Sequence, residues 1–254
     1  RAVAGRKSKV SISTKVGRPL RPGTNLETDK YPDADPGLET YYDYSSLGIR
    51  NGLEASLKRL NLESIEIAYL HDAQDCVREA IEVAYPVLDQ MRSEGIVKAI
   101  GLGMNWCPAS IEIIKNTDLN IALIAGRFTL LDQSAQDELY PLALKKKVSI
   151  VAAGVYNTGV LANPVEGALF DYAPASKEII NRALEIRDFL KDFNVPLTAA
   201  AMQFPLRHPA VITVLNGAGT VSELKDNIAA FDFELPANLW SELESAGLIS
   251  PVNI

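Results

Sequence analysis

Three polar side chains stand where predicted β-strands of this chain end. Lys15 closes a β-branched segment, His71 closes the alternating segment 65–70, and Asn105 follows the apolar, glycine-containing segment 97–103. An imidazole can orient or move a proton near neutral pH, and a lysine ammonium lowers the pKa of neighbouring acids. An amide can fix the face of a flat heterocycle by hydrogen bonding. The three residue types together indicate a catalytic site that holds a ring-shaped ligand.

A packing role is the commoner one for an isolated histidine, so the position of His71 decides its interpretation. It ends a strand, next to Asp72, and ligands of parallel α/β folds bind at the carboxyl ends of the strands. His208 instead precedes a predicted strand, and we interpret it as structural. Trp106 and Trp240 are interpreted as packing residues, although Trp106 follows Asn105 and could also face a ligand.

The segments that must position these residues alternate between strand and helix. We predict strands near 10–14, 65–70, 98–102, 120–124, 148–152 and 211–215 from their β-branched or alternating sequences. We predict a first helix that is capped by Ser45 or Ser46 and carries Leu53, Leu57 and Leu60 on one face. Further helices are predicted over 77–92, 108–115, 132–146, 176–193, 197–206, 222–231 and 237–246. Residues 18–45 and 157–175 are rich in turn formers and are expected to be long loops.

This order predicts an α/β fold with parallel strands joined by right-handed crossovers. No shift in composition marks a linker, so residues 1–254 are expected to form a single domain. Units of about 30 residues favour a (β/α)8 barrel over a doubly wound sheet, with six of the eight units recognisable. Gly101-Leu102-Gly103 lacks the third glycine of a dinucleotide fingerprint, which argues against a Rossmann fold.

Composition excludes several classes of partner. The chain is 47% hydrophobic and 22% charged, with a net charge of −7, and its mean hydropathy is close to zero. No basic stretch of the kind that binds nucleic acid occurs, and no apolar run is long enough to span a membrane. The two cysteines lack metal-ligand spacing and fit a reducing compartment, so we predict a cytoplasmic protein without a metal site.

Several motifs in their order along the chain resemble the aldo-keto reductase superfamily, and within it the aldose 1-dehydrogenase branch. The motifs are Ser-Thr-Lys-Val-Gly at 13–17, Ser-Leu-Lys-Arg-Leu at 56–60, Tyr-Leu-His-Asp at 69–72, Gly-Leu-Gly-Met-Asn at 101–105, Ala-Gly-Arg-Phe-Thr-Leu-Leu-Asp-Gln-Ser at 125–134 and Phe-Asp-Tyr-Ala-Pro at 170–174. The resemblance implies a (β/α)8 barrel that binds a nicotinamide cofactor and transfers a hydride at a carbonyl carbon.

By this resemblance Lys15 and His71 are two of four catalytic residues. The other two, an aspartate and a tyrosine, are expected upstream of the sequence given, together with about 60 residues at about 30 per strand–helix unit. Tyr41, Tyr42 and Tyr44 do not match the motif of the catalytic tyrosine, and we do not assign them the acid role.

The resemblance also implies a site for the adenosine phosphate at residues 215–220 and the helix that follows, because glycines and a helix amino terminus favour a phosphate. A lysine and an arginine of NADP-using relatives are replaced by Gly217 and Glu223. A carboxylate repels a 2′-phosphate but can accept a hydrogen bond from a free ribose hydroxyl, which favours NAD over NADP. The alternative is that Glu223 is only a solvated helix residue. The predicted cofactor-binding residues are Asn105, Gly154, Tyr156, Gly217, Ala218, Gly219, Thr220, Glu223, Asp226 and Asn227.

Two departures concern the nicotinamide pocket. A glutamine that often contacts the carboxamide is replaced by Ala125, and an aromatic that often stacks on the ring is replaced by Ala153, for which Tyr156 could substitute. The expected activity is NAD-dependent oxidation of the C1 hydroxyl of an aldose to a lactone. Two alternatives stay open: chemistry on another ring alcohol or aldehyde such as pyridoxal, and a non-catalytic, nucleotide-sensing partner subunit. The loops 18–45 and 157–175 do not specify the substrate.

Overall fold

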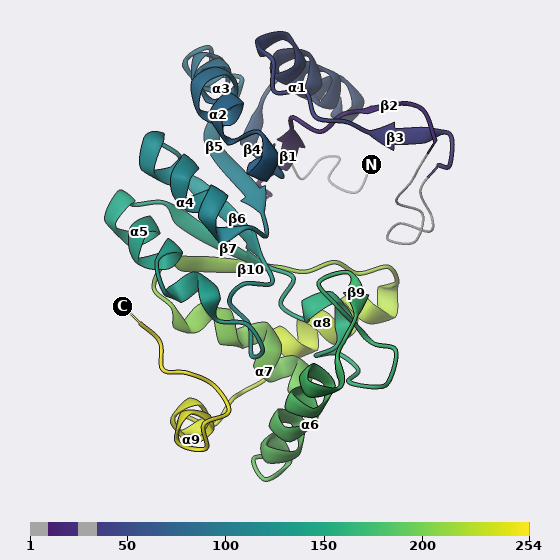
Figure 1. Ribbon diagram of the computed structural model, residues 1–254, viewed down its shortest axis with the longest axis vertical. Coiled ribbons are helices and arrows are strands. Elements are labelled where there is room, and N and C mark those ends of the chain that lie inside the picture. The colour runs from purple at the N-terminus through teal and green to yellow at the C-terminus, as the bar shows by residue number, and fades with distance from the viewer. Residues whose placement is uncertain (1–9, 25–34, 254) are drawn as a thin grey trace. The chain divides into compact units, whose positions relative to one another are not determined.

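The computed structural model describes residues 10–24 and 35–253 and divides into two compact units. The first unit comprises the chain up to Leu123 with residues 146–148, and the second comprises residues 124–145 and 149–254. All six predicted strands are present (Figure 1). They are β1 (Ser13–Val16), β4 (Ile65–His71), β5 (Val97–Met104), β6 (Ile121–Ala125), β7 (Ser149–Ala153) and β10 (Val211–Leu215).

In the first unit, β4 lies between β1 and β5, and both pairs are parallel. The start of β6 adjoins β5, because the amide of Asn120 donates to the carbonyl of Ile100 (2.9 Å). Ala68 and Leu70 of β4 are fully buried, and burying a leucine side chain stabilises the fold by roughly 1.5–3 kcal/mol. Helices pack around these strands: α1 (Ser46–Leu60), α2 (Val77–Glu79), α3 (Tyr85–Ser93) and α4 (Cys107–Asn116).

Helix α1 begins with the serine cap that its sequence predicts. The hydroxyl of Ser45 accepts a hydrogen bond from the amide of Gly48 (3.0 Å), which satisfies one of the unpaired donors of the first turn. Leu53 and Leu57 face the core, and Asn61 ends the helix in the left-handed conformation. The predicted helix 77–92 is instead interrupted by a π-helical stretch at Ala80–Ala84 between α2 and α3. Pro86 lacks the amide that would continue α-helical bonding there.

In the second unit, β7 pairs with β10 in parallel, and the end of β6 adjoins β7 through a bond from the Gly126 amide to the Ala153 carbonyl (2.8 Å). Five helices follow or flank these strands: α5 (Leu139–Lys146), α6 (Lys177–Lys191), α7 (Leu197–Gln203), α8 (Val221–Phe231) and α9 (Leu239–Ser245). Phe128, Tyr140 and Phe204 pack ring against ring in its core.

Three boundary predictions were wrong. The first strand begins at Ser13, not near residue 10. The amide of Ile12 donates to the carboxylate of Glu66 (3.0 Å) and is therefore not available for pairing with a neighbouring strand. The helix expected over 132–146 begins only at Leu139, after a 3₁₀ turn at Ser134–Gln136. The helix expected over 197–206 ends at Gln203 and continues as a 3₁₀ turn, where Pro205 cannot donate a hydrogen bond.

The two predicted loops also contain strands. The first holds the antiparallel pair β2 (Leu20–Pro22) and β3 (Leu38–Thr40), and the second holds β8 (Leu169–Phe170) and β9 (Ala173–Pro174). These strands are two or three residues long, too short to produce a recognisable alternation of apolar residues. None of the described helices is long and apolar enough to cross a membrane. That residues 1–254 form a single domain stays a prediction.

Candidate active site

Lys15 and His71 lie on adjacent strands of the first unit. Lys15 pairs with Tyr69 between β1 and β4, and His71 pairs with Gly103 between β4 and β5. Two glycines of β5 leave space for the side chains of Tyr69 and Lys15. A Cβ atom at Gly101 would lie 2.7 Å from the ring of Tyr69, and one at Gly103 would lie 3.3 Å from Cε of Lys15. The stem of Lys15 therefore runs across β5 beside the residue that pairs with His71.

His71 is neutral at pH 7. Burial is the main cause that lowers its pKa to about 4, the carboxylate of Asp72 opposes this shift, and the cations of Lys15 and Arg18 add to it. A neutral imidazole has one ring nitrogen that donates and one that accepts a hydrogen bond. His71 is therefore suited to hold an uncharged substrate oxygen by a hydrogen bond.

Asp72 and Arg18 belong to the surroundings of His71, and sequence reasoning did not assign either of them to the site. Oδ2 of Asp72 lies 2.9 Å from Nη1 of Arg18 and 3.4 Å from Nε2 of His71. Arg18 also donates to the hydroxyl of Thr40 (3.3 Å) in β3 and lies over the ring of Tyr42 (5.7 Å). One feature of the sequence could have identified Arg18 and Asp72. Both are charged, and each lies within three positions of a predicted catalytic residue.

Tyr44 contacts the backbone of His71. Its hydroxyl donates a hydrogen bond to the His71 carbonyl (2.7 Å), and the side chain is 4% exposed. Burial raises the pKa of Tyr44 far above its usual value, so its hydroxyl stays protonated at neutral pH. The hydroxyl is occupied as the donor to this backbone carbonyl, and the absence of an acid role for Tyr44 stays a prediction.

Asn105 directly follows β5 and is half-buried. Trp106, the next residue, is 55% exposed, so the prediction that it is a packing residue was wrong. It precedes a helix that starts at Cys107, and its indole ring is not covered by the core. Trp240 does pack, with its ring 5.9 Å from that of Phe204.

In the second unit, one hydrogen-bond chain joins three of the predicted cofactor-binding residues. The hydroxyl of Tyr156 donates to Oδ1 of Asn227 (3.4 Å), and Nδ2 of Asn227 donates to the carbonyl of Gly217 (3.1 Å). Burial raises the pKa of Tyr156, and the charge of Asp226 adds to this effect. These two hydrogen bonds connect the segment after β7 to the loop after β10.

The same loop forms the amino terminus of α8. The hydroxyl of Thr220 accepts from the amide of Glu223 (3.1 Å), and Oε2 of Glu223 accepts from the amide of Gly219 (2.7 Å). This is a close variant of the capping box. Gly217 and Ala218 are exposed, and a Cβ atom at Gly217 would meet open space. Gly154, after β7, is also exposed, and its carbonyl accepts from the amide of Asn157 (2.8 Å).

These contacts test which nucleotide the loop can accommodate. The open backbone at 217–218 and the helix amino terminus are suited to a phosphate of a dinucleotide. Glu223, however, places a carboxylate at the same terminus. That carboxylate can accept a hydrogen bond from a ribose hydroxyl and would repel a second phosphate on the ribose. The loop therefore combines an exposed backbone that can receive a phosphate with a carboxylate at the same helix terminus. Within the described part of the chain, no cluster of three metal-ligating side chains occurs.

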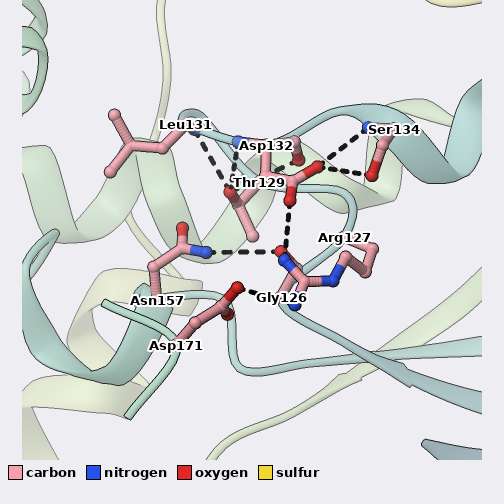
Figure 2. Close-up of polar contacts among 8 residues, drawn as sticks. All are labelled: Gly126, Arg127, Thr129, Leu131, Asp132, Ser134, Asn157 and Asp171. Carbon is pink, nitrogen blue, oxygen red and sulfur yellow. Dashed lines mark hydrogen bonds and ion pairs between the residues drawn. The ribbon is translucent and has the colours of Figure 1, made fainter. Parts of the chain in front are cut away.

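Arg127 joins two of the sequence motifs that carried the family resemblance (Figure 2). Its guanidinium lies 2.8 Å from Oδ2 of Asp132 in its own motif and 2.7 Å from Oδ2 of Asp171, which lies between β8 and β9. Asn157 lies close by, where its Nδ2 donates to the carbonyl of Gly126 (3.3 Å). Arg127 thereby attaches the β8–β9 hairpin to the loop after β6. Sequence reasoning did not identify this pairing.

The first unit thus carries a lysine and a histidine on neighbouring parallel strands, and the second unit carries a capped glycine loop before a helix. The sequence model of the aldo/keto reductase family matches residues 1–247, and the chain belongs to this family. It is an oxidoreductase of a family that uses NAD(P)H and acts on small molecules.

Relatives and solved structures agree with this assignment. D-threo-aldose 1-dehydrogenase from a Pseudomonas species is 37% identical over 246 residues, which cover 94% of this chain and 75% of the relative. Pyridoxal 4-dehydrogenase from Microbacterium luteolum is 36% identical, covering 94% of this chain and 76% of that enzyme. The holo structure of an aldo-keto reductase from Bacillus halodurans superimposes with a TM-score of 0.74 at 22% identity, covering 98% of this chain and 75% of that one.

Proposed function

We propose that this protein is an NAD-dependent dehydrogenase that oxidises the C1 hydroxyl of a cyclic aldose to a lactone. The observation that carries the proposal is the neutral imidazole of His71 beside the stem of Lys15. The similarity to D-threo-aldose 1-dehydrogenase supports the sugar as substrate class. Pyridoxal 4-dehydrogenase is about as similar, so oxidation of a ring alcohol or aldehyde of the pyridoxal type is the second candidate.

The proposed roles follow from charge and hydrogen bonding. His71 holds the sugar oxygen by a hydrogen bond, because its pKa of about 4 keeps the ring neutral. The ammonium of Lys15 favours the anionic form of whichever group takes the hydroxyl proton. The bound cofactor would accept the hydride from C1. Gly217, Ala218, Gly219 and Thr220 would hold its phosphate, with Asn105, Gly154, Tyr156, Asp226 and Asn227 as further contacts.

An activity screen separates the candidates. A full-length preparation, which includes the aspartate and the tyrosine expected upstream of this sequence, is incubated with NAD and a panel of aldoses, and with NAD and pyridoxal, while the absorbance of NADH is followed. Faster turnover of an aldose supports the proposal, and faster turnover of pyridoxal supports the second candidate. Nucleotide binding without turnover of either class would contradict both and favour a nucleotide-sensing subunit. A His71→Ala variant is the control for adventitious dehydrogenases.

The preference for NAD over NADP is a separate prediction that depends on Glu223. A 2′-phosphate adds about two negative charges near a carboxylate. Lys225 is the nearest cation in sequence, but it lies two positions past Glu223 on α8 and should point to a different face of the helix. Losing one charge-assisted hydrogen bond costs roughly 1.5–3 kcal/mol, so we expect NAD to bind at least about tenfold more tightly than NADP.

Glu223→Arg should narrow or invert this preference, measured by titration at fixed ionic strength. Glu223→Gln is the matched control, since its amide can still accept the hydrogen bond from Gly219. Glu223→Gln should weaken the preference for NAD over NADP without reversing it. Equal or tighter binding of NADP by the unmodified chain would show that the assignment of this loop is wrong.

A further inference from the structure

The ion pair at the end of β4 has no role in the function proposed so far. Asp72 is next to His71 in sequence, and Arg18 follows β1, 54 residues earlier. We propose that Asp72, held in place by Arg18, keeps the proton of the neutral His71 ring on Nε2 and so makes Nε2 the hydrogen-bond donor. The proposal rests on the function given above only in taking His71 as the residue that binds the substrate oxygen. Asp72 and Arg18 would then be positioning residues.

The first step of the argument is the choice between two neutral tautomers. A neutral imidazole carries its proton on either Nδ1 or Nε2, and the neighbour of each nitrogen decides which form is favoured. Oδ2 of Asp72 lies 3.4 Å from Nε2 of His71. An ionised carboxylate accepts hydrogen bonds and cannot donate them. The negative charge beside Nε2 therefore favours the tautomer that has its proton on this nitrogen.

The second step is the role of Arg18. An unpaired carboxylate beside an imidazole would favour the doubly protonated, charged ring. Arg18 lies 2.9 Å from the same carboxylate oxygen, and its side chain is only 14% exposed. Together with Lys15 it opposes the effect of Asp72 on the charge of His71. Burial, with the two cations adding to its effect, thus keeps the ring neutral while the carboxylate still selects the tautomer.

The third step is that the carboxylate is fixed in position. Asp72 has a left-handed backbone (φ 53°), which is uncommon for residues other than glycine, asparagine and aspartate. Its amide donates to the carbonyl of Gly103 (3.0 Å), and Tyr44 binds the carbonyl of His71. Arg18 is itself held by Thr40. These contacts fix the position of the Asp72 carboxylate beside the ring of His71.

The chain contains only two histidines, so nitrogen NMR of the imidazole rings can test the proposal. The experiment uses the unmodified chain at neutral pH without cofactor or substrate, and His71→Gln assigns the signals. We expect His71 to be predominantly protonated on Nε2. His208 is an internal reference, because its Nδ1 accepts from the amide of Ala210 (3.1 Å) and its Nε2 faces the carbonyl of Asn253 (2.9 Å).

Two variants remove the carboxylate without backbone strain. Asp72→Gly deletes the side chain, and glycine adopts positive φ freely. Asp72→Asn removes the charge, and asparagine also tolerates this conformation. Both should shift His71 toward a mixture of tautomers, with the larger shift in Asp72→Gly, while the signals of His208 stay unchanged. Unchanged His208 signals also show that the second unit is folded, and a circular dichroism spectrum equal to that of the unmodified chain shows that the first unit is folded too.

Arg18→Met should raise the pKa of His71 in an NMR titration, because it removes a cation and leaves the carboxylate unpaired. Arg50→Met is the matched control, since Arg50 forms an exposed ion pair of the same length with Glu94 (2.9 Å) in the same unit. It should leave both histidines unchanged.

The proposal is overturned if His71 of the unmodified chain carries its proton on Nδ1, or if the tautomer is the same after Asp72→Gly. Neither result depends on turnover, so the failure of the proposed sugar oxidation would leave the tautomer measurement intact. A kinetic readout follows once a substrate is known: Asp72→Asn should lower kcat more than it changes KM.

Discussion

The surroundings of His71 and His208 show how one residue type is used in two ways. Both rings have a lowered pKa, and burial is the main cause in each case. The partners differ. His71 faces charged side chains, whereas the partners of His208 are a backbone amide, a backbone carbonyl and the rings of Phe128 and Tyr140.

This difference teaches that a lowered pKa alone does not mark a functional histidine. His208 has both ring nitrogens occupied by backbone groups and is fully buried, so it has no capacity left for a ligand. The prediction from sequence that it is structural agrees with this arrangement. His71 is partly exposed and faces groups that can respond to a substrate.

The largest effect should come from removing the His71 ring. We expect His71→Ala to lower kcat/KM by about a hundredfold or more, the range in which a residue that positions or transfers a proton contributes. Its stability should change by less than about 1 kcal/mol, because the ring is not part of the core. Steady-state kinetics and denaturant unfolding measure the two quantities. If His71→Ala retained activity, His71 would not be a functional histidine, and the contrast with the structural His208 would be wrong.

The corresponding change at His208 should act on stability. His208→Ala removes a fully buried ring and leaves the Ala210 amide and the Asn253 carbonyl without a partner. The cavity and the unpaired groups together should cost about 3 kcal/mol in the free energy of unfolding. Activity per folded molecule should be unchanged. A variant as stable as the unmodified chain would mean that the hydrogen bonds of His208 to Ala210 and Asn253 do not stabilise the fold.

Acid should destabilise the protein through both histidines. The pKa of each is lower in the folded state than the unfolded value of about 6.5, so the unfolded chain binds more protons as the pH falls. Stability is therefore complete above about pH 6.5 and is lost progressively as the pH falls toward 4, where His71 titrates. His71 accounts for at most about 3 kcal/mol of the unfolding free energy that is lost over this pH range.

Unfolding free energies measured across this pH range check the prediction. His71→Gln and His208→Gln should each make the dependence on pH less steep, since glutamine does not titrate. A slope that neither substitution changes would assign the acid effect to carboxylates instead.

The smallest effect should come from Tyr44→Phe, which removes the hydroxyl that binds the His71 carbonyl. A buried acceptor without its donor should cost about 1 kcal/mol of stability. We expect a loss of activity well below that of His71→Ala, because the imidazole itself remains. A loss as large as that of His71→Ala would show that the backbone contact, and not the ring, distinguishes this region from that of His208.

The strands and the residues at their ends were predictable because their signals are local. Ile65, Ile67 and Tyr69 alternate within one short segment, and His71 simply follows. The pairs Arg18–Asp72 and Arg127–Asp171 were not predictable, since their members lie 54 and 44 residues apart and meet only through the fold. The short hairpins in the loops were missed because two or three residues give no measurable period.

The attachment of the β8–β9 hairpin has a consequence for how the protein can change over evolution. The hairpin is held by the guanidinium of Arg127 and by the Thr158 hydroxyl, which accepts from the amide of Tyr172 (3.3 Å). Doubling the length of a flexible loop costs only about 0.6 kcal/mol in closure entropy. Insertions at the exposed residues 165–167 can therefore accumulate at little cost while these two anchors persist. They would leave the buried residues Val160 and Leu161 and the strands of the sheet unchanged.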